Sequence, residues 1–442
     1  MIDHHPFNPR QIAWNIIKAA LKAVDPDRAV RNYFAAHPEI VSQIESSSGR
    51  IFVIGAGKAG APMAAAIADI FGPRITAGLI IVKYGHIAEV WPDRVAVREA
   101  GHPVPDEAGL AAAQEIVDLL GETTENDTVL CLVSGGGSAL LTLPAVGLTL
   151  DDLQITTEVL LAAGATINQF NTVRKHLSAV KGGGLARLAA PARVHSLILS
   201  DVVGDPLEVI ASGPTVPDPT SFADSWRIIE QFRLEEMLPA AVVQRLHDGG
   251  ALSLVDTPKL GDPVFRHVTN TIIGSNRIAA RAAVQAARTA GLKAELLTTY
   301  IEGEAREVGR VMAALAKGLA TDEGSIERPA CLIAGGETTV TLTGGGKGGR
   351  NQEMALAAAI SLAGWQNTLV VCVGTDGNDG PTEAAGAFAD GTTISRAEAL
   401  GLDAVKFLQR NDAYHFFAPL NDLLMTGPTN TNVNDLTLVF AW

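Results

Sequence analysis

The chain has 442 residues, of which 47% are apolar and 19% charged, so its composition is that of a folded protein of two or three domains. Its formal net charge of −14 at pH 7 argues against binding to nucleic acids or anionic membranes, because an acidic surface repels both partners. No stretch approaches the roughly 18 apolar residues of a membrane span, and residues 1–6 lack a secretion signal, so we expect a cytoplasmic protein.

An amphipathic helix is predicted at residues 10–24, where apolar side chains recur at helical spacing before Asp25-Pro26. Short apolar runs follow, most of them leading into a turn rich in Gly, Ser or Asp and then into a helical pattern. These runs are predicted as strands at residues 51–54, 78–82, 129–133, 196–199, 270–273, 331–334 and 369–373. Apolar strands that alternate with helices are typical of a parallel sheet covered on both faces, so the sequence predicts an α/β fold.

Two domains are predicted, with a transition near residues 255–265. Residues 206–265 are rich in proline and carry one helical piece at 224–248, which separates two strand–helix series. We expect residues 1–260 to form a Rossmann-like domain with a mostly parallel sheet and helices on both faces. Residues 261–442 are expected to form a second α/β domain, whose sheet is mixed because residues 338–342 read as a hairpin partner of the preceding strand.

The first turn of chemical interest is Gly55-Ala-Gly-Lys-Ala-Gly60, which matches G-x-G-x-x-G. Its glycines permit a tight turn, and Lys58 beside Gly57 indicates a bound anion. A dinucleotide site would need an acid after the next strand, where Lys83 stands instead, although a lysine there suits NADP. A plain strand–helix turn is the alternative.

Ser134, Gly135, Gly136, Gly137 and Ser138 follow the apolar strand at 129–133. Consecutive glycines cost conformational entropy, so they are favoured where a backbone must approach a ligand closely. We interpret this turn as a cradle for a carboxylate or phosphate, with a flexible turn as the alternative.

Residues 168–184 predict a basic helix that ends in a glycine run. Arg174 or Lys181 could hold an acid substrate, or the helix could simply present a solvated basic face. Asp201 and Asp205 follow the strand at 196–199, where either carboxylate could serve as a base, a magnesium ligand or a helix cap.

The segment 344–353 places five glycines and two cations before a clear helix. Backbone N–H groups, a helix dipole and an arginine in this arrangement indicate polyphosphate binding. Asp376 and Asp379 occupy a later turn that predicts either a divalent cation or ribose contact, or an Asx-rich turn. The three cysteines, Cys131, Cys331 and Cys372, lie in apolar runs and are predicted to be buried strand residues.

In this order the motifs resemble the class II glycerate kinases, whose C-terminal part is called the MOFRL domain, over roughly residues 10–440. The carriers are Gly55-Ala-Gly-Lys-Ala-Gly60, Ser134-Gly-Gly-Gly-Ser-Ala-Leu140, Asn171-Thr-Val-Arg-Lys-His-Leu-Ser-Ala-Val-Lys-Gly-Gly183, Leu199-Ser-Asp-Val-Val-Gly-Asp-Pro206, Ala211-Ser-Gly-Pro-Thr215, Gly335-Gly-Glu-Thr-Thr-Val340, Gly348-Gly-Arg-Asn-Gln-Glu353, Gly374-Thr-Asp-Gly-Asn-Asp-Gly380 and Gly427-Pro-Thr-Asn-Thr-Asn-Val-Asn-Asp-Leu436. Asn430 departs from the small residue expected in that tail.

The resemblance implies ATP-dependent phosphorylation of D-glycerate, usually at the 2-hydroxyl, by two α/β domains with the active site in the cleft between them. It assigns catalytic roles to Lys58, Asp201 and Arg350. Substrate or phosphate contacts are expected from Gly57, Ser134, Gly135, Gly136, Gly137, Ser138, Arg174 and Lys181. Nucleotide contacts are expected from Glu337, Gly346, Lys347, Gly348, Gly349 and Asn351, and Mg²⁺ ligands from Asp376 and Asp379.

The expected mechanism is phosphoryl transfer, in which positioning and charge neutralisation matter most. Asp201 would orient or deprotonate the glycerate hydroxyl, and Lys58 and Arg350 would neutralise the transferred group. Two alternatives remain: an NAD(P)H-dependent hydroxypyruvate reductase, a label that members of the family have also received, and a non-catalytic sugar-acid sensor. A homodimer is compatible with the sequence.

Overall fold

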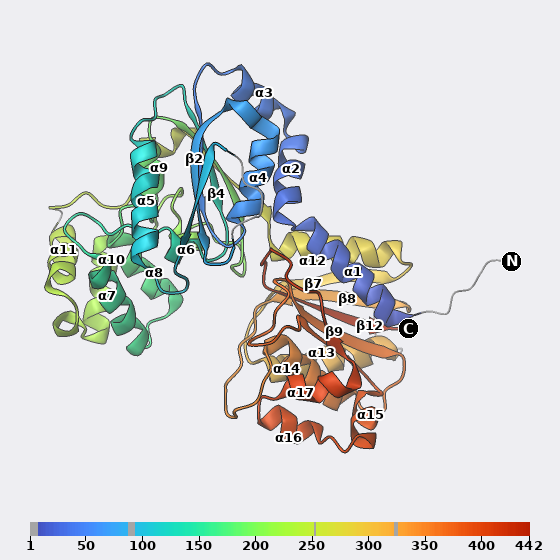
Figure 1. The fold of residues 1–442 in the computed structure, drawn as a ribbon. Helices are drawn as coiled ribbons and strands as arrows, with labels where there is room; N and C mark the ends of the chain where they lie inside the picture. The colour runs from blue at the N-terminus through green and yellow to red at the C-terminus, as the bar shows by residue number, and fades with distance from the viewer. Residues whose placement is uncertain (1–7, 87–92, 252, 322–325) are drawn as a thin grey trace. The chain divides into compact units, whose positions relative to one another are not determined.

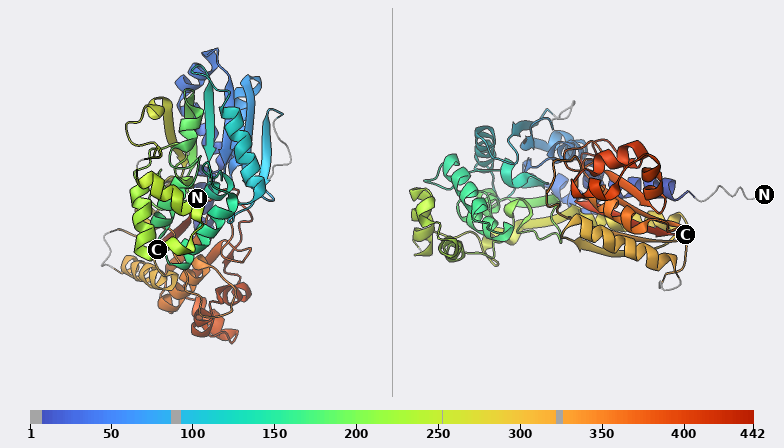
Figure 2. Two further views of the ribbon diagram at one scale, coloured as in Figure 1. Left: turned by 90° about the vertical axis from the view of Figure 1, so that its left-hand side faces the viewer. Right: turned by 90° about the horizontal axis from the view of Figure 1, so that it is seen from below.

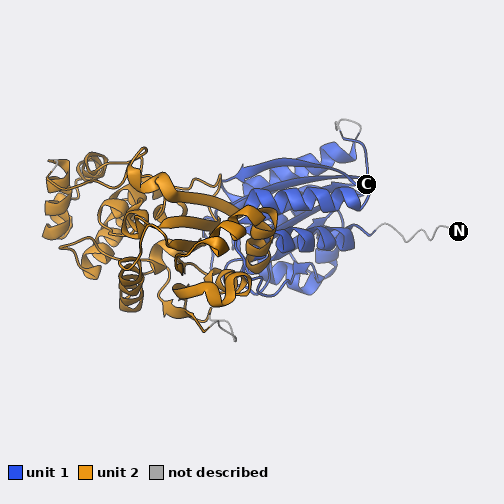
Figure 3. Ribbon diagram, turned by 90° about the horizontal axis from the view of Figure 1, so that it is seen from above, with its two compact units in different colours: residues 1–25, 274–442 blue, residues 26–273 orange. Residues whose placement is uncertain are grey.

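The computed structural model describes residues 8–86, 93–251, 253–321 and 326–442, so the expectation about the N-terminal six residues lies outside the described part. The chain divides into two compact units (Figure 3). Unit 1 consists of residues 1–25 and 274–442, and unit 2 consists of residues 26–273. Each unit carries its own sheet.

The first domain was predicted as residues 1–260, whereas unit 2 begins at residue 26 and ends at residue 273. Helix α1 (Pro9–Ala23) belongs to unit 1, where it packs along α12 (Asn276–Thr289). Strand β6 (Val268–Gly274) instead forms the edge of the sheet in unit 2. The spacing of apolar residues predicted both elements, but it carries no information about which sheet or helix each one joins.

Unit 2 is built on a six-stranded sheet in the order β3-β2-β1-β4-β5-β6 (Figure 1). The other strands of this sheet are β1 (Ile51–Ala56), β2 (Ile75–Lys83), β3 (Val95–Ala100), β4 (Thr128–Val133) and β5 (Arg193–Leu199). The pairings from β3 to β5 are all parallel. Every residue of β1 and β4 is buried, which explains why both read as continuous apolar runs.

Helices cover both faces of this sheet, as predicted. Helices α2 (Pro26–Ala36) and α4 (Gly60–Phe71) lie against one face, and α5 (Glu107–Leu120) and α9 (Gly184–Ala189) against the other (Figure 1). The chain proceeds from β1 outward to β3 and then returns to β4 on the other side of β1. The strand order therefore reverses between β1 and β4, the point at which sheets of this kind bind ligands.

A group of helices in unit 2 packs around a core of its own, beside the sheet (Figure 2). Its members are α7 (Leu150–Ala162), α8 (Ile167–His176), α10 (Phe222–Phe232) and α11 (Ala240–Gly250). The helical piece predicted at 224–248 is thus two helices. Unit 2 also contains α3 (Pro38–Ser46) and the four-residue α6 (Gly137–Leu140).

Unit 1 is built on a mixed sheet in the order β11-β10-β9-β12-β8-β7. Its strands are β7 (Lys293–Ile301), β8 (Ala330–Gly336), β9 (Thr368–Gly374), β10 (Gly386–Asp390), β11 (Leu423–Leu424) and β12 (Asp435–Ala441). Helices α1 and α12 cover one face, and α13 (Ala305–Ala320) and α14 (Arg350–Leu362) cover the other (Figure 1). Three short helices, α15 (Thr393–Ala399), α16 (Ala404–Gln409) and α17 (Ala413–Phe417), complete the unit.

The mixed character of this sheet was predicted, but for a reason that is wrong. Residues 338–342 form no strand, and only Thr339 makes an isolated bridge, to Glu304. The antiparallel neighbour of β8 is instead β12, from the end of the chain, which also pairs antiparallel with β9. A strand inserted from a distant segment leaves no local signal of its position.

The predicted burial of the cysteines is confirmed, since Cys131, Cys331 and Cys372 are buried in β4, β8 and β9. Among the described residues, no helix has the length and apolar character needed to cross a bilayer.

Candidate active site

The turns after β1 and β4 interlock where the strand order of unit 2 reverses. Gly57 has a φ of +143°, and a Cβ added there would lie 2.1 Å from Oγ of Ser134. The Ala59 N–H donates to this Oγ at 3.1 Å, and the Lys58 N–H donates to the Gly135 carbonyl at 2.9 Å. The close approach requires glycine at position 57, so the glycine motif positions Lys58 against the second turn.

Asp201, which follows β5, lies against the same turn. A Cβ added to Gly135 would be 2.3 Å from Oδ2 of Asp201. Burial raises the pKa of Asp201, and the positive charge of Lys58 opposes that rise. A carboxylate whose pKa is raised in this way is a stronger proton acceptor than an ordinary aspartate, as a general base requires.

His102 is a member of this cluster that sequence reasoning missed. Gly136 has a φ of +84°, and a Cβ there would lie 2.9 Å from Cδ2 of His102 and 3.6 Å from Cγ of Lys58. Burial and the nearby charges of Lys58, Lys83 and His86 lower the pKa of His102 to about 4, so the ring is neutral at pH 7. The sequence signal for this residue is Gly101-His102-Pro103, directly after β3. Strand β3 itself was not predicted, because its residues are of mixed polarity.

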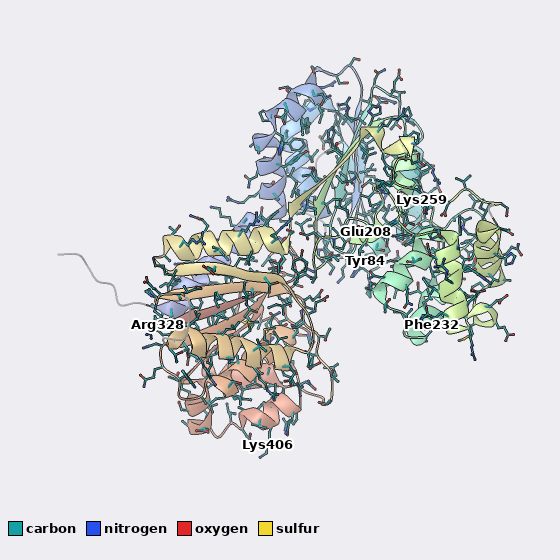
Figure 4. The ribbon with its side chains drawn as sticks, turned by 180° about the vertical axis from the view of Figure 1, so that it is seen from behind. Tyr84, Glu208, Phe232, Lys259, Arg328 and Lys406 are labelled. Atoms are coloured by element: carbon teal, nitrogen blue, oxygen red, sulfur yellow. The ribbon has the colours of Figure 1, made fainter. Side chains whose placement is uncertain are left out.

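Further loops reach the same edge of the sheet. Figure 4 labels Tyr84 and Glu208, which come from the loops after β2 and β5. The Tyr84 hydroxyl donates to Oδ2 of Asp106 at 2.7 Å. This edge therefore gathers polar side chains from the ends of several parallel strands, as expected for a ligand site.

Arg174 and Lys181 hold the short helix α6, which begins in the glycine turn. Nζ of Lys181 donates to the carbonyls of Ser138 at 2.5 Å and Leu141 at 2.9 Å, and Nη2 of Arg174 donates to Ser138 O at 3.3 Å. Lys181 is buried, so the interpretation as a solvated face is wrong for this residue. Within the described ranges, no ion pair with a carboxylate is found for either cation, and burial lowers the pKa of both. Oγ of Ser138 pairs with Oγ of Ser212 at 2.7 Å.

Arg350 begins α14 in unit 1 and forms a bidentate ion pair with Asp435, the first residue of β12. Nε and Nη2 of Arg350 lie 2.5 and 3.0 Å from the two carboxylate oxygens. Nη1 is 3.1 Å from Oε1 of Glu337, and Nδ2 of Asn434 donates to Oε2 of Glu337 at 2.9 Å. Burial raises the pKa of Asp435, and Arg350 opposes this rise. Asp435 and Asn434 contact Arg350 and Glu337 but were not predicted as site residues, although they stand in the quoted tail motif.

The glycine segment before α14 packs closely within unit 1. The Gly346 N–H donates to Arg410 O at 3.0 Å, and the Lys347 N–H donates to Oδ1 of Asp412 at 2.9 Å. A Cβ on Gly346 would lie 2.4 Å from Cβ of Asp412. Nζ of Lys347 lies 3.4 Å from Oε2 of Glu383. These contacts give two of the predicted nucleotide-binding residues, Gly346 and Lys347, internal partners in the structure.

Asp379 caps the N-terminus of α14. Its Oδ1 accepts the Asn351 N–H at 3.0 Å and its Oδ2 accepts the Gln352 N–H at 2.8 Å. The buried Asp379 also blocks a side chain at Gly349, whose added Cβ would lie 2.4 Å from Oδ1. Oδ1 of Asp376 accepts the Asn378 N–H at 3.2 Å. These bonds use both carboxylate oxygens of Asp379, and the described part of the chain holds no group of three or more His, Cys, Asp or Glu residues suited to a metal ion. Magnesium ligation by Asp376 and Asp379 stays a prediction.

The predicted residues thus form two clusters, each within one unit. In unit 2 the cluster joins Gly57, Lys58, Ser134, Gly135, Gly136, Gly137 and Asp201, with Ser138, Arg174 and Lys181 attached through α6. In unit 1 the cluster joins Glu337, Gly349, Arg350, Asn351 and Asp379, with Gly348 beside Gly380. The first cluster combines a cation, a carboxylate of raised pKa and a glycine turn, and the second combines an arginine and a helix N-terminus.

Comparison with known proteins extends over nearly the whole chain. Residues 12–247 match the profile described as a domain of unknown function (DUF4147), and residues 330–435 match the MOFRL family. The chain is 41% identical to D-glycerate 2-kinase of Thermotoga maritima, covering 98% of both chains. It is 43% identical to glycerate 2-kinase of Pyrococcus horikoshii, covering 98% of this chain and 97% of the relative.

A third relative, from Agrobacterium vitis, is 41% identical over 97% of this chain and 94% of its own length, and has a provisional hydroxypyruvate reductase name. Among solved structures, the crystal structure of glycerate kinase from Thermotoga maritima superposes with a TM-score of 0.89 at 40% identity, covering 98% of this chain and 99% of that one. The chain belongs to the glycerate 2-kinase family that carries the MOFRL domain.

Proposed function

We propose that this protein transfers the γ-phosphoryl group of ATP to the 2-hydroxyl of D-glycerate, giving 2-phospho-D-glycerate and ADP. The observation that carries the proposal is the cluster of Lys58, Asp201 and the glycine turn at the strand-order reversal of unit 2. It combines a carboxylate of raised pKa with a lysine and backbone donors, the groups that a hydroxy acid substrate needs. The full-length kinase relatives support the same reaction.

Asp201 is proposed to accept the proton of the glycerate 2-hydroxyl. The hydroxyl oxygen then bonds to the γ-phosphorus while the bond from phosphorus to the oxygen of ADP breaks. Lys58 and the backbone N–H groups of Gly135 and Gly136 are proposed to bind the substrate carboxylate and to stabilise the charge that develops on the transferred group. The neutral ring of His102 contributes a wall of this site without adding positive charge.

Arg350 is proposed to act on the nucleotide from the N-terminus of α14. The ion pair with Asp435 fixes the guanidinium plane, and a fixed arginine suits phosphate recognition better than a flexible one. Magnesium enters as the MgATP complex, since such ions are held largely by phosphate oxygens and water.

A coupled assay with D-glycerate, Mg²⁺ and ATP tests the proposal. ADP should form only when D-glycerate is present, and enolase alone should then convert the product. A product that requires phosphoglycerate mutase before enolase would mean phosphorylation at the 3-hydroxyl, and absence of ADP would refute kinase activity.

The reductase name of some relatives calls for one parallel measurement. Purified protein is mixed with hydroxypyruvate and NADH or NADPH, and absorbance at about 340 nm is followed. We expect no substrate-dependent loss of absorbance. A loss comparable to the rate of ADP formation would favour the reductase.

A further inference from the structure

A second basic site lies in unit 2, in a cavity of about 230 Å³. Its basic lining residues are Lys175, His176, Lys181, Arg187 and Arg245. Lys175 and His176 end α8, Arg187 lies on α9 and Arg245 on α11, so helices from separate parts of the chain converge on one space. Of the residues grouped above with Lys58 and Asp201, Lys181 alone lines this cavity, and its Nζ already donates to the carbonyls of Ser138 and Leu141.

The carboxylates near the cavity pair with two of its basic residues, Lys175 and His176. Asp218 lies 3.3 Å from Nζ of Lys175. Asp256 lies 3.0 Å from Nε2 of His176 and 3.3 Å from Nζ of Lys259, which Figure 4 labels in unit 2. Asp218 and Asp256 therefore neutralise the side of the cavity formed by the end of α8.

The two arginines of the cavity have no such partner. Nη2 of Arg187 donates to the Asp256 carbonyl at 2.7 Å, and Nε of Arg245 donates to the His176 carbonyl at 2.8 Å. Over the described residues, no carboxylate lies within ion-pair distance of either guanidinium. Each arginine has five N–H donors, so most of the donors on both side chains remain for a ligand.

Arg245 is held in place for such a ligand. Its guanidinium lies over the Phe222 ring, 5.7 Å from the ring centre, and burial lowers its pKa. A half-buried cation without a counter-ion is unfavourable, and an anion in the cavity would relieve that cost. This excess of positive charge is notable in a chain whose formal net charge is −14.

We propose that this cavity binds the phosphate group of a small metabolite, at a site separate from the phosphoryl-transfer site. The planar donor forks of Arg187 and Arg245 match the oxygens of a phosphate. The volume is below the range of about 300–1,000 Å³ that drug-sized ligands occupy, so a small phosphate ester fits the cavity better than a nucleotide does.

Isothermal titration of the full-length protein with inorganic phosphate tests this site. Wild type should bind phosphate, and the double variant Arg187→Gln/Arg245→Gln should bind it at least about tenfold more weakly, because both forks are removed. The matched control is Arg227→Gln, at an exposed arginine of α10 that does not line the cavity, and it should keep the wild-type affinity. Absence of phosphate binding by wild type, unchanged binding by the double variant, or loss of binding in Arg227→Gln would each overturn the proposal.

Two further measurements keep the test decisive. Arg187 is exposed, so Arg187→Glu should fold normally and should abolish phosphate binding by placing a like charge at the cavity. Titration with D-glycerate should give the same affinity in wild type and in the double variant. Loss of glycerate binding in the double variant would identify the cavity as the substrate site and overturn the inference. The phosphate titration needs no turnover, so its outcome is independent of the kinase assay.

Discussion

Gly135 leaves room for the carboxylate of Asp201: a Cβ built on this glycine would lie 2.3 Å from Oδ2 and 2.9 Å from Cγ. The two residues follow adjacent parallel strands, β4 and β5, so their proximity is a consequence of the sheet topology. A side chain at position 135 would therefore displace the carboxylate of Asp201, the proposed base.

Gly135→Ala should reduce turnover strongly by displacing the Asp201 carboxylate. A displacement of about 1 Å at a reacting group can cost about a hundredfold in rate. The measurement is kcat with D-glycerate and MgATP. Gly250→Ala is the matched control, because a Cβ there meets no atom within 4 Å. Equal losses in the two variants would contradict the argument from Asp201.

Ser134→Ala should destabilise the protein by about 1–3 kcal/mol, because the buried Ala59 N–H loses its acceptor. The free energy of unfolding is measured by denaturant titration, with Ser46→Ala, at an exposed position, as the control. The Michaelis constant for D-glycerate should rise as well, since the turns after β1 and β4 would no longer interlock. An unfolding free energy equal to that of the control would show that the hydroxyl does not join the two turns.

Arg350→Met should lower both stability and activity by leaving buried Asp435 without its partner. The expected cost is about 2–3 kcal/mol, below that of a fully buried pair because the side chain of Arg350 is 33% exposed. Arg310→Met, which breaks an exposed ion pair with Glu307, should cost no more than about 1 kcal/mol. A Michaelis constant for ATP equal to that of wild type would argue against a role of Arg350 at the nucleotide.

His102 makes stability sensitive to acid. Its pKa is about 4 in the folded protein and about 6.5 in an unfolded chain, so acid protonates the unfolded state first. The stabilisation from the neutral ring is present above pH 6.5 and is lost as the pH falls through about 4. The groups that face the ring are Lys58, Lys83 and His86.

His102→Gln should therefore show a smaller fall in melting temperature between pH 7 and pH 4.5 than wild type shows. His247→Gln, at an exposed position of α11, serves as the control and should follow wild type. If the melting temperatures of wild type and His102→Gln fall equally with pH, the imidazole of His102 has the same pKa in the folded and the unfolded protein, which would contradict this account.

Much of this site could be predicted from the sequence because its signals are local. Continuous apolar strands such as 129–133 and the glycine turns that follow them are determined by residues next to one another. The order of the strands then brings Lys58, Gly135 and Asp201 together at one edge of the sheet, as expected for parallel strands.

The rest depended on contacts between distant segments. Strand β12 lies between β8 and β9 although it ends the chain, and its first residue, Asp435, pairs with Arg350. His102 was missed because β3 has mixed polarity and did not read as a buried strand. Gly346 packs closely against Arg410 and Asp412. A glycine required by such packing and a glycine required by a bound phosphate give the same sequence pattern, so the sequence alone cannot separate the two.

The turnover number of Asp201→Asn, measured by ADP formation with D-glycerate and MgATP, tests the proposed base most directly. Removing the base should lower kcat by about 10²–10⁴-fold. Since burial raises the pKa of Asp201, the ionised carboxylate costs stability as the pH rises, so the neutral amide should unfold no more readily at pH 8. Asp205→Asn, in the same loop at a φ of +57° that asparagine tolerates, should keep wild-type turnover. Near-normal kcat in a folded Asp201→Asn protein would contradict the role of this residue as the base.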